Sequence, residues 1–146
     1  MSAKEFFLDV AHALTGCQLV EQELKLYITE ALALVHKCVG NRMVFKMTGD
    51  DYENTSLEGL IKIFGKLSDN STLLKDLNKF KDERNFLSHQ GISHCLDLED
   101  ELFIHSAVEY QPRLNAIRPE AERLRAEIRE EAGKIHIHLY YDDLAK

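Results

Sequence analysis

Turn-forming residues are scarce in this chain of 146 residues, which contains only two prolines and seven glycines. Folds built from many short strands need a turn residue at each connection, so this scarcity favours long helices. Hydrophobic residues make up 45% and charged residues 29%, which is typical of globular rather than disordered or fibrous proteins. A chain of this length can bury a core of its own, so we expect residues 1–146 to form a single helical domain.

Basic charge is also in short supply, and the formal net charge is −7. Broad, sequence-independent binding to nucleic acid requires a basic face, so the composition argues against that function for the chain as a whole. A small local basic site is still compatible with it.

Cysteines are few and long apolar runs are absent. Cys17, Cys38 and Cys95 are an odd number at wide spacing and form no CxxC pair, which indicates reduced thiols in a cytosolic protein. Charged residues such as Glu21 and Lys25 interrupt the most apolar stretch, so no transmembrane helix is expected. The N-terminal residues lack the layout of a signal peptide. We therefore expect a cytoplasmic protein with no membrane association.

Apolar residues at three- and four-residue steps predict a helix over residues 3–39, although Thr15-Gly16 could divide it. Gly40-Asn41 is expected to end this helix. Residues 41–54 are expected to form a loop with a short helical turn, from which Met43, Phe45 and Met47 could tuck under the bundle.

Two helices are predicted in the middle of the chain. Thr55 stands three residues before Glu58, which is the capping-box spacing, and so begins the first. Residues 68–70 end that helix and cap the next, which is predicted over residues 71–90 with Gly91 as its stop.

The last third of the chain is predicted as two helices and a tail. Residues 97–110 are expected to be helical, and Pro119 is expected to open a separate last helix that reaches Gly133. Residues 135–141 alternate like a short strand. The predicted fold is therefore an all-α, up-and-down bundle of four to five helices with a short extended C-terminal tail.

One cluster has the character of a site: Arg84, Asn85 and His89 near the end of the third predicted helix. Asn85 and His89 are four residues apart and so share a helical face, which the long side chain of Arg84 can reach. Arginine offers a planar fork of donors to a phosphate, and histidine can move a proton near neutral pH. His89 could deprotonate a ribose 2′-hydroxyl while Arg84 stabilises charge on phosphorus, with Asn85 in support. Lys79 and Lys81, just upstream, are the candidate RNA-binding residues.

The stretch Arg84-Asn85-Phe-Leu-Ser-His89 resembles the motif of HEPN domains: arginine, a polar residue, three residues, histidine. The preceding amphipathic stretch, residues 57–64, is similar to the helix that often comes before that motif, and the motif helix ends at Gly91 as in the family. The resemblance extends loosely over residues 19–91. In toxins of the family that pair with a nucleotidyltransferase, a tyrosine commonly stands two residues after the histidine, and here that residue is Gly91.

The resemblance implies a helical bundle, often a homodimer whose two motifs meet across the interface. Many members are metal-independent endoribonucleases of toxin–antitoxin or other defence systems, which would make Arg84 and His89 catalytic, with Asn85 supporting them. RNA would then be the substrate, and an antitoxin a possible partner. Other members are non-catalytic interaction or regulatory modules that act through a dimer or a protein partner.

Simpler interpretations stand beside this one. Arg84 could pair with a nearby carboxylate, and His89 could interact with the helix dipole at its C-terminus. His136 and His138 could reach one side of a strand, but neither they nor His94, Cys95 and His105 show a known zinc spacing, so no metal or cofactor is expected.

Overall fold

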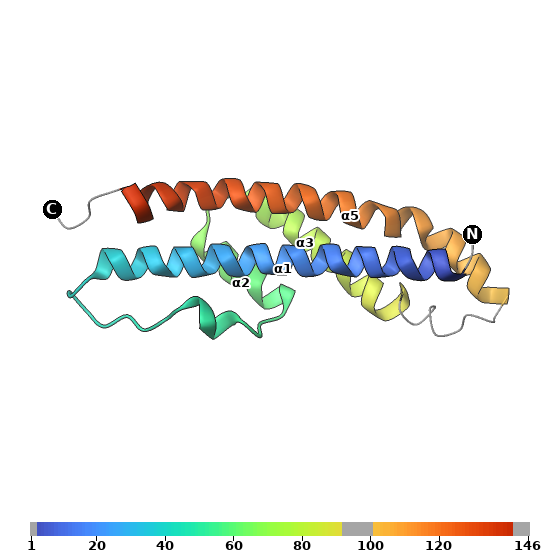
Figure 1. Cartoon of the computed structure of the whole chain (residues 1–146), viewed down its shortest axis with the longest axis horizontal. Helices are drawn as coiled ribbons and strands as arrows, with labels where there is room; N and C mark the ends of the chain where they lie inside the picture. Colours follow the sequence, from blue (N-terminus) through green and yellow to red (C-terminus); the bar gives the residue numbers. More distant parts are fainter. Residues whose placement is uncertain (1–2, 92–100, 142–146) are drawn as a thin grey trace.

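The computed structural model describes residues 3–91 and 101–141. Within these residues the chain is all-α, as predicted, and contains no β-strand. Its four α-helices are α1 (Ala3–Val39), α2 (Leu57–Leu67), α3 (Ser71–Phe86) and α5 (Glu101–His136). The long helices α1 and α5 lie side by side, and the short α2 and α3 pack against them (Figure 1). None of the helices in these two ranges is long and apolar enough to cross a bilayer.

The directions of the helices follow from contacts between distant residues. Side chains of α1 meet α5 in the same order along both helices, so α1 and α5 run parallel. The successive pairs are Asp9–Gln111, Glu23–Arg129 and Glu30–His136. The helix α3 runs antiparallel to α5, because its contacts with α5 come in reverse order. Those pairs are Asp76–Arg123 and Glu83–Arg113. The bundle therefore departs from strict up-and-down alternation.

The first helix is continuous, so Thr15-Gly16 does not divide it. Gly16 instead allows α5 to come close, since a Cβ at this position would lie 3.2 Å from the Cβ of Ala121. The helix ends at Gly40, which has φ of +54° and donates its N–H to the carbonyl of His36 at 2.9 Å. Glycine reaches this left-handed conformation at little cost, so the predicted helix end is confirmed.

The loop that follows contains the expected short turn, a 3₁₀ helix over Gly49–Tyr52. Phe45 packs against the core, but Met43 and Met47 are exposed, so the expectation that all three would be covered was wrong for the two methionines. The cap of α2 is Ser56 rather than Thr55, because the Ser56 hydroxyl accepts the N–H of Gly59 at 3.2 Å.

The C-terminal third differs most from prediction. Pro112 and Pro119 lie inside one continuous helix, so no separate helix begins at Pro119. Both prolines are on the exposed side of α5, where carbonyls left without a helical donor can bond to water. The sequence predicts a helix over residues 97–110, and its first four residues, 97–100, lie outside the described part of the chain.

The expected strand over residues 135–141 is also absent. The helix α5 continues to His136 and ends in a π-turn over Ile137–Tyr141. The ammonium group of Lys37 donates to the carbonyls of His138 at 3.2 Å and Leu139 at 2.8 Å. A distant lysine thus satisfies carbonyls at the helix end, which alternation in the local sequence does not reveal.

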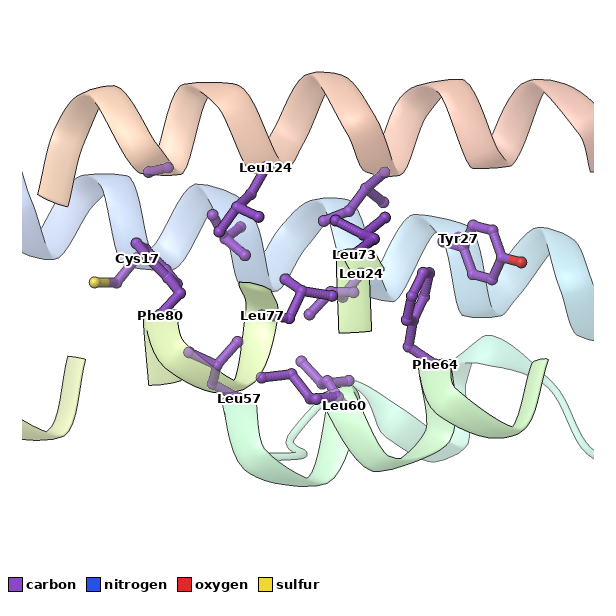
Figure 2. Close-up of a cluster of buried hydrophobic side chains, with 14 of the residues drawn as sticks. Cys17, Leu24, Tyr27, Leu57, Leu60, Phe64, Leu73, Leu77, Phe80 and Leu124 are labelled. Atoms are coloured by element: carbon purple, nitrogen blue, oxygen red, sulfur yellow. The ribbon is translucent and has the colours of Figure 1, made fainter. Parts of the chain in front are cut away.

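One apolar core runs between the four helices (Figure 2). The largest fully buried side chains come from every helix. They include Phe6, Leu24, Ile28, Leu60, Phe64, Leu77, Phe80, Ile117 and Leu124. Phe6 is 1% exposed and belongs to this core, whereas its neighbour Phe7 is 54% exposed.

Asn70 holds the α2–α3 turn against α5. Its side-chain oxygen accepts the N–H of Leu73 at 3.0 Å, which confirms the predicted cap of α3. Its amide nitrogen donates to Glu131 of α5 at 2.8 Å. One side chain therefore starts a helix and joins it to another.

We expect Asn70→Asp to destabilise the protein, although aspartate is a good helix cap. The change removes the donor to Glu131 and places two carboxylates together, which should lower the free energy of unfolding by about 1–3 kcal/mol. Urea denaturation at pH 7 measures this change. Ser56→Asp is the control, because it keeps the cap of α2 on the exposed surface and should change stability by less than about 0.5 kcal/mol. Equal stability of the two variants would show that the bond to Glu131 contributes nothing.

Candidate functional site

Arg84 occupies a place in the buried stripe of α3. The apolar residues of this stripe follow one another at steps of three or four. They are Leu73, Leu77, Phe80 and Leu87, all buried. Arg84 stands four residues after Phe80 and three before Leu87, so its side chain leaves the helix on the side that faces α1. Its Nε lies 3.9 Å from Oε1 of Glu21, at the outer limit of an ion pair. The guanidinium side chain is still 41% exposed, so water reaches it.

A buried residue close to this ion pair is Cys17, one helical turn before Glu21. Burial raises the pKa of the Cys17 thiol to about 11, although the nearby charge of Arg84 opposes this rise. A thiol with so high a pKa is neutral at pH 7 and a poor nucleophile. Cys17 therefore belongs to the core (Figure 2) and adds no reactive group to the site.

Asn85 and His89 lie on the outer side of the same segment, and both are exposed. The helix changes from α to π over Leu87–Gly91, and the N–H of Leu87 is shared between the carbonyls of Glu83 and Arg84. A π-turn contains more residues per turn than an α-turn. The angle around the helix axis between residues five apart, such as Arg84 and His89, is therefore smaller than in a regular α-helix. Such turns occur often at functional sites. The convergence of all three polar groups on one phosphate-sized volume stays a prediction.

The charges of α3 are arranged so that two acidic residues face α5. Asp76 bonds Arg123 at 3.0 Å, and Glu83 forms a two-pronged ion pair with Arg113 at 2.6 and 3.0 Å. Lys79 is exposed and Lys81 is half-buried. The arginines of α5 thus neutralise two carboxylates close to the lysines, and the local surface is less acidic than the formal charge of −7 suggests.

Arg113 also fastens the motif segment from the other side. Its guanidinium carbon lies 3.7 Å from the ring centre of Phe86, and that ring meets Tyr110 edge-on at 5.1 Å. The bond to Glu83 raises the pKa of Arg113 above its ordinary value. Phe86 follows Asn85 and precedes His89 in the sequence, so its contacts with α5 hold the backbone that carries the candidate residues. Sequence reasoning missed these contacts, because Arg113 belongs to another helix and lies 30 residues from Glu83.

A second polar cluster lies at the far end of α3, beside an open groove of about 490 Å³. Tyr27, Lys66, Ser68, Lys134 and His138 are among the residues that line it. Glu131 also lines the groove and is only 6% exposed. Its carboxylate accepts bonds from Ser68 at 3.2 Å, Asn70 at 2.8 Å and Lys134 at 2.8 Å.

The bonds around Glu131 decide its ionisation. Burial acts to raise the pKa of Glu131, but the bonds from Lys134, Asn70 and Ser68 outweigh it, so the pKa lies below the ordinary value of 4.5. Burial likewise raises the pKa of Tyr27, whose hydroxyl donates to the carbonyl of Leu67 at 3.4 Å. The polar groups of this cluster satisfy one another, so they join α5 to the α2–α3 turn. Ser68 and Glu131 are 63 residues apart, and no local pattern pairs them.

The histidines considered as metal ligands have other roles or lie elsewhere. His136 contacts the carboxylate of Glu30. His94 and Cys95 lie outside the described residues, and the side chain of His105 is not described. Among the side chains that are described, no group of three or more histidine, cysteine, aspartate or glutamate residues could hold a metal ion.

Comparison with known proteins identifies no relative, since no family model, no curated protein and no solved structure matches the chain.

We expect Arg113→Lys to loosen the motif segment while keeping the charge. Lysine cannot form the two-pronged bond to Glu83 or stack flat on Phe86, so the free energy of unfolding should fall by about 1 kcal/mol. Amide hydrogen exchange should also accelerate in residues 87–91. Arg118→Lys is the control, because Arg118 is 61% exposed and forms only a surface pair at 3.8 Å. If both variants exchange at the rate of wild type in this segment, Arg113 does not hold it.

The lowered pKa of Glu131 predicts a pH-dependent contribution to stability. Its carboxylate is more acidic in the folded than in the unfolded protein, so its contribution is complete above about pH 4.5 and is lost as pH falls through the folded pKa. The difference in unfolding free energy between wild type and Glu131→Gln should therefore be largest at neutral pH and shrink below pH 4.5. Urea titrations from pH 7 to pH 3 measure it. Glu130→Gln, on the exposed side of the same turn, should show no such decline.

Proposed function

We propose that this protein is a metal-independent endoribonuclease of a toxin or defence type. The observation that carries the proposal is that a half-exposed Arg84 and an exposed His89 lie in one short segment, where α3 ends in a π-turn. The resemblance of Arg84-Asn85-Phe-Leu-Ser-His89 to the HEPN motif supports it, as does the position of Lys79 and Lys81 one to two turns earlier on the same helix.

The proposed chemistry uses the 2′-hydroxyl of the RNA itself. His89 takes the proton of this hydroxyl as its oxygen attacks phosphorus. The bond from phosphorus to the 5′-oxygen breaks, and a proton from water completes the new 5′-hydroxyl. The other product end is a 2′,3′-cyclic phosphate. Arg84 stabilises the negative charge that develops on the phosphoryl oxygens, because its planar fork of donors suits them. Asn85, exposed beside them, supports the substrate or the imidazole.

Arg84 can bind a phosphate only if its ion pair with Glu21 leaves guanidinium donors available. At 3.9 Å the ion pair is loose, and the guanidinium has donors left for a phosphate. Because the pair is longer than a hydrogen bond, an incoming phosphate can compete with Glu21 for Arg84.

A second candidate function is a non-catalytic interaction or regulatory protein of the same fold. The net charge of −7 and the carboxylate of Glu21 beside Arg84 favour it. In that case Arg84 and His89 are surface residues of a module that binds a protein partner, such as an antitoxin or a second copy.

The test is cleavage of a single-stranded RNA by purified protein in the presence of EDTA. We expect wild type to release fragments with 2′,3′-cyclic phosphate ends, and His89→Ala to be slower by about 100-fold or more, as for loss of a general base. Arg84→Ala should behave like His89→Ala. An RNA with 2′-deoxy sugars should resist cleavage.

Two substitutions of the same type control for loss of any exposed histidine or arginine. His36→Ala, at the exposed end of α1, and Arg118→Ala, on the exposed face of α5, should cleave like wild type. Wild type that leaves RNA intact, or that is matched in rate by His89→Ala, would reject the nuclease and leave the interaction protein.

A further inference from the structure

The outward face of α1 carries a continuous uncharged stripe, here called the α1 seam. It consists of Leu8, His12, Thr15, Leu19, Gln22 and Leu26. Successive members are separated by four, three, four, three and four residues, and all six are exposed. The three leucines are 46%, 38% and 58% exposed. Along about 27 Å of helix, no charged side chain of α1 other than His12 interrupts the stripe. Charged side chains of α5 border it at one small pocket, where Arg118, Glu122 and Arg125 lie beside His12, Thr15 and Leu19.

The seam places three exposed leucines on a helix that already buries its other side. Val10, Cys17 and Leu24 face the core from the opposite side of α1. A helix at the surface of a bundle normally presents charged and polar residues to water. The hydroxyl of Thr15 donates its proton to the carbonyl of Ala11 at 2.9 Å, which leaves no donor of Thr15 unpaired on this face. The composition of the seam is therefore that of a contact surface.

Steps of four and three residues are the spacing at which two helices pack against each other over several turns. We propose that the α1 seam is the contact between two copies of this chain, with the two α1 helices parallel. The proposal is independent of the nuclease chemistry.

The charges beside the seam point to a second copy and to the parallel orientation. One flank carries Asp9 and Glu30, and the other carries Lys4 and Lys25. In a parallel pair the opposite flanks of the two helices adjoin, which brings Lys25 of one copy to Glu30 of the other, and Lys4 to Asp9. In an antiparallel pair like flanks adjoin, so Asp9 would meet Glu30 and repel it.

The acidic residues can accept these additional partners. Gln111 of α5 bonds one carboxylate oxygen of Asp9, and His136 contacts one oxygen of Glu30. The second oxygen of each carboxylate is left for a lysine of the other copy. Both acids are half-buried, where an ion pair is less screened than in open water.

The proposed dimer keeps the two Arg84 motifs apart. Glu21, which contacts Arg84, lies on the side of α1 that faces α3, away from the seam. The HEPN resemblance instead implies a dimer in which the two motifs meet. The α1 seam thus specifies a different interface, which does not involve Arg84.

The contact is tested by sedimentation equilibrium from 1 to 100 µM, concentrations on the order at which specific dimers form. We expect a dimer for wild type. Leu19→Glu with Leu26→Glu should raise the dissociation constant by about 100-fold or more, because four charges would be buried in the contact. Met43→Glu with Val44→Glu is the matched control. These residues are 62% and 73% exposed in the loop after α1, and the variant should dimerise like wild type. Circular dichroism confirms that each variant remains helical.

The orientation is tested by a single engineered cysteine. In a parallel pair each seam residue faces its own counterpart, so Gln22→Cys should form a disulfide-linked dimer under mild oxidation. The background carries Cys38→Ser and Cys95→Ser, and Val44→Cys in the same background should stay unlinked. A monomeric wild type at every concentration, or equal dissociation of seam and control variants, overturns the proposal. If a disulfide forms only when the Leu19→Cys and Gln22→Cys variants are mixed, and not within either variant alone, the pair is antiparallel. That result overturns the parallel orientation.

Discussion

The parallel packing of α1 against α5 is the constraint on which the other elements depend. The two helices come close at Gly16 and Ala121, and side chains join them along their length. At the centre, Glu23 is 7% exposed and is held by Arg129 at 2.6 Å and Arg125 at 3.6 Å. A buried carboxylate without such partners would cost several kcal/mol. These charges therefore permit few other alignments of the two helices.

Because α1 and α5 are parallel, the end of α1 and the start of α5 lie at opposite ends of the bundle, and a short turn cannot join them. The chain returns along α1 through the loop over residues 40–56, in which Gly49 comes close to Thr29, and then forms the α2–α3 hairpin (Figure 1). Asn70 and Glu131 attach one end of that hairpin to α5, and Arg113 attaches the other through Glu83 and Phe86. The candidate motif lies at this second end. Its backbone is thus held by α5, while Arg84 reaches α1.

The two proposals concern opposite sides of the molecule. Arg84 and His89 lie where α3 ends, and the α1 seam lies on the face of α1 turned away from α3. A dimer through the seam would leave both copies of the motif accessible to RNA or to another protein. For binding of RNA at the motif, the net charge of the chain then matters less than the local charge of α3, where arginines of α5 neutralise Asp76 and Glu83.

The sequence by itself determined the helical class, the buried stripes, the Asn70 cap and the end of α1 at Gly40, because each depends on residues within one or two turns. It also placed Arg84, Asn85 and His89 in one short segment. Only the tertiary structure decided that α5 continues through Pro112 and Pro119, since packing along α1 outweighs the loss of two backbone bonds. It likewise decided that the tail is helical, through Lys37, and that Arg84 faces Glu21. Lys37 and Leu139 are 102 residues apart, and Glu21 and Arg84 are 63 residues apart, so local periodicity does not encode these contacts.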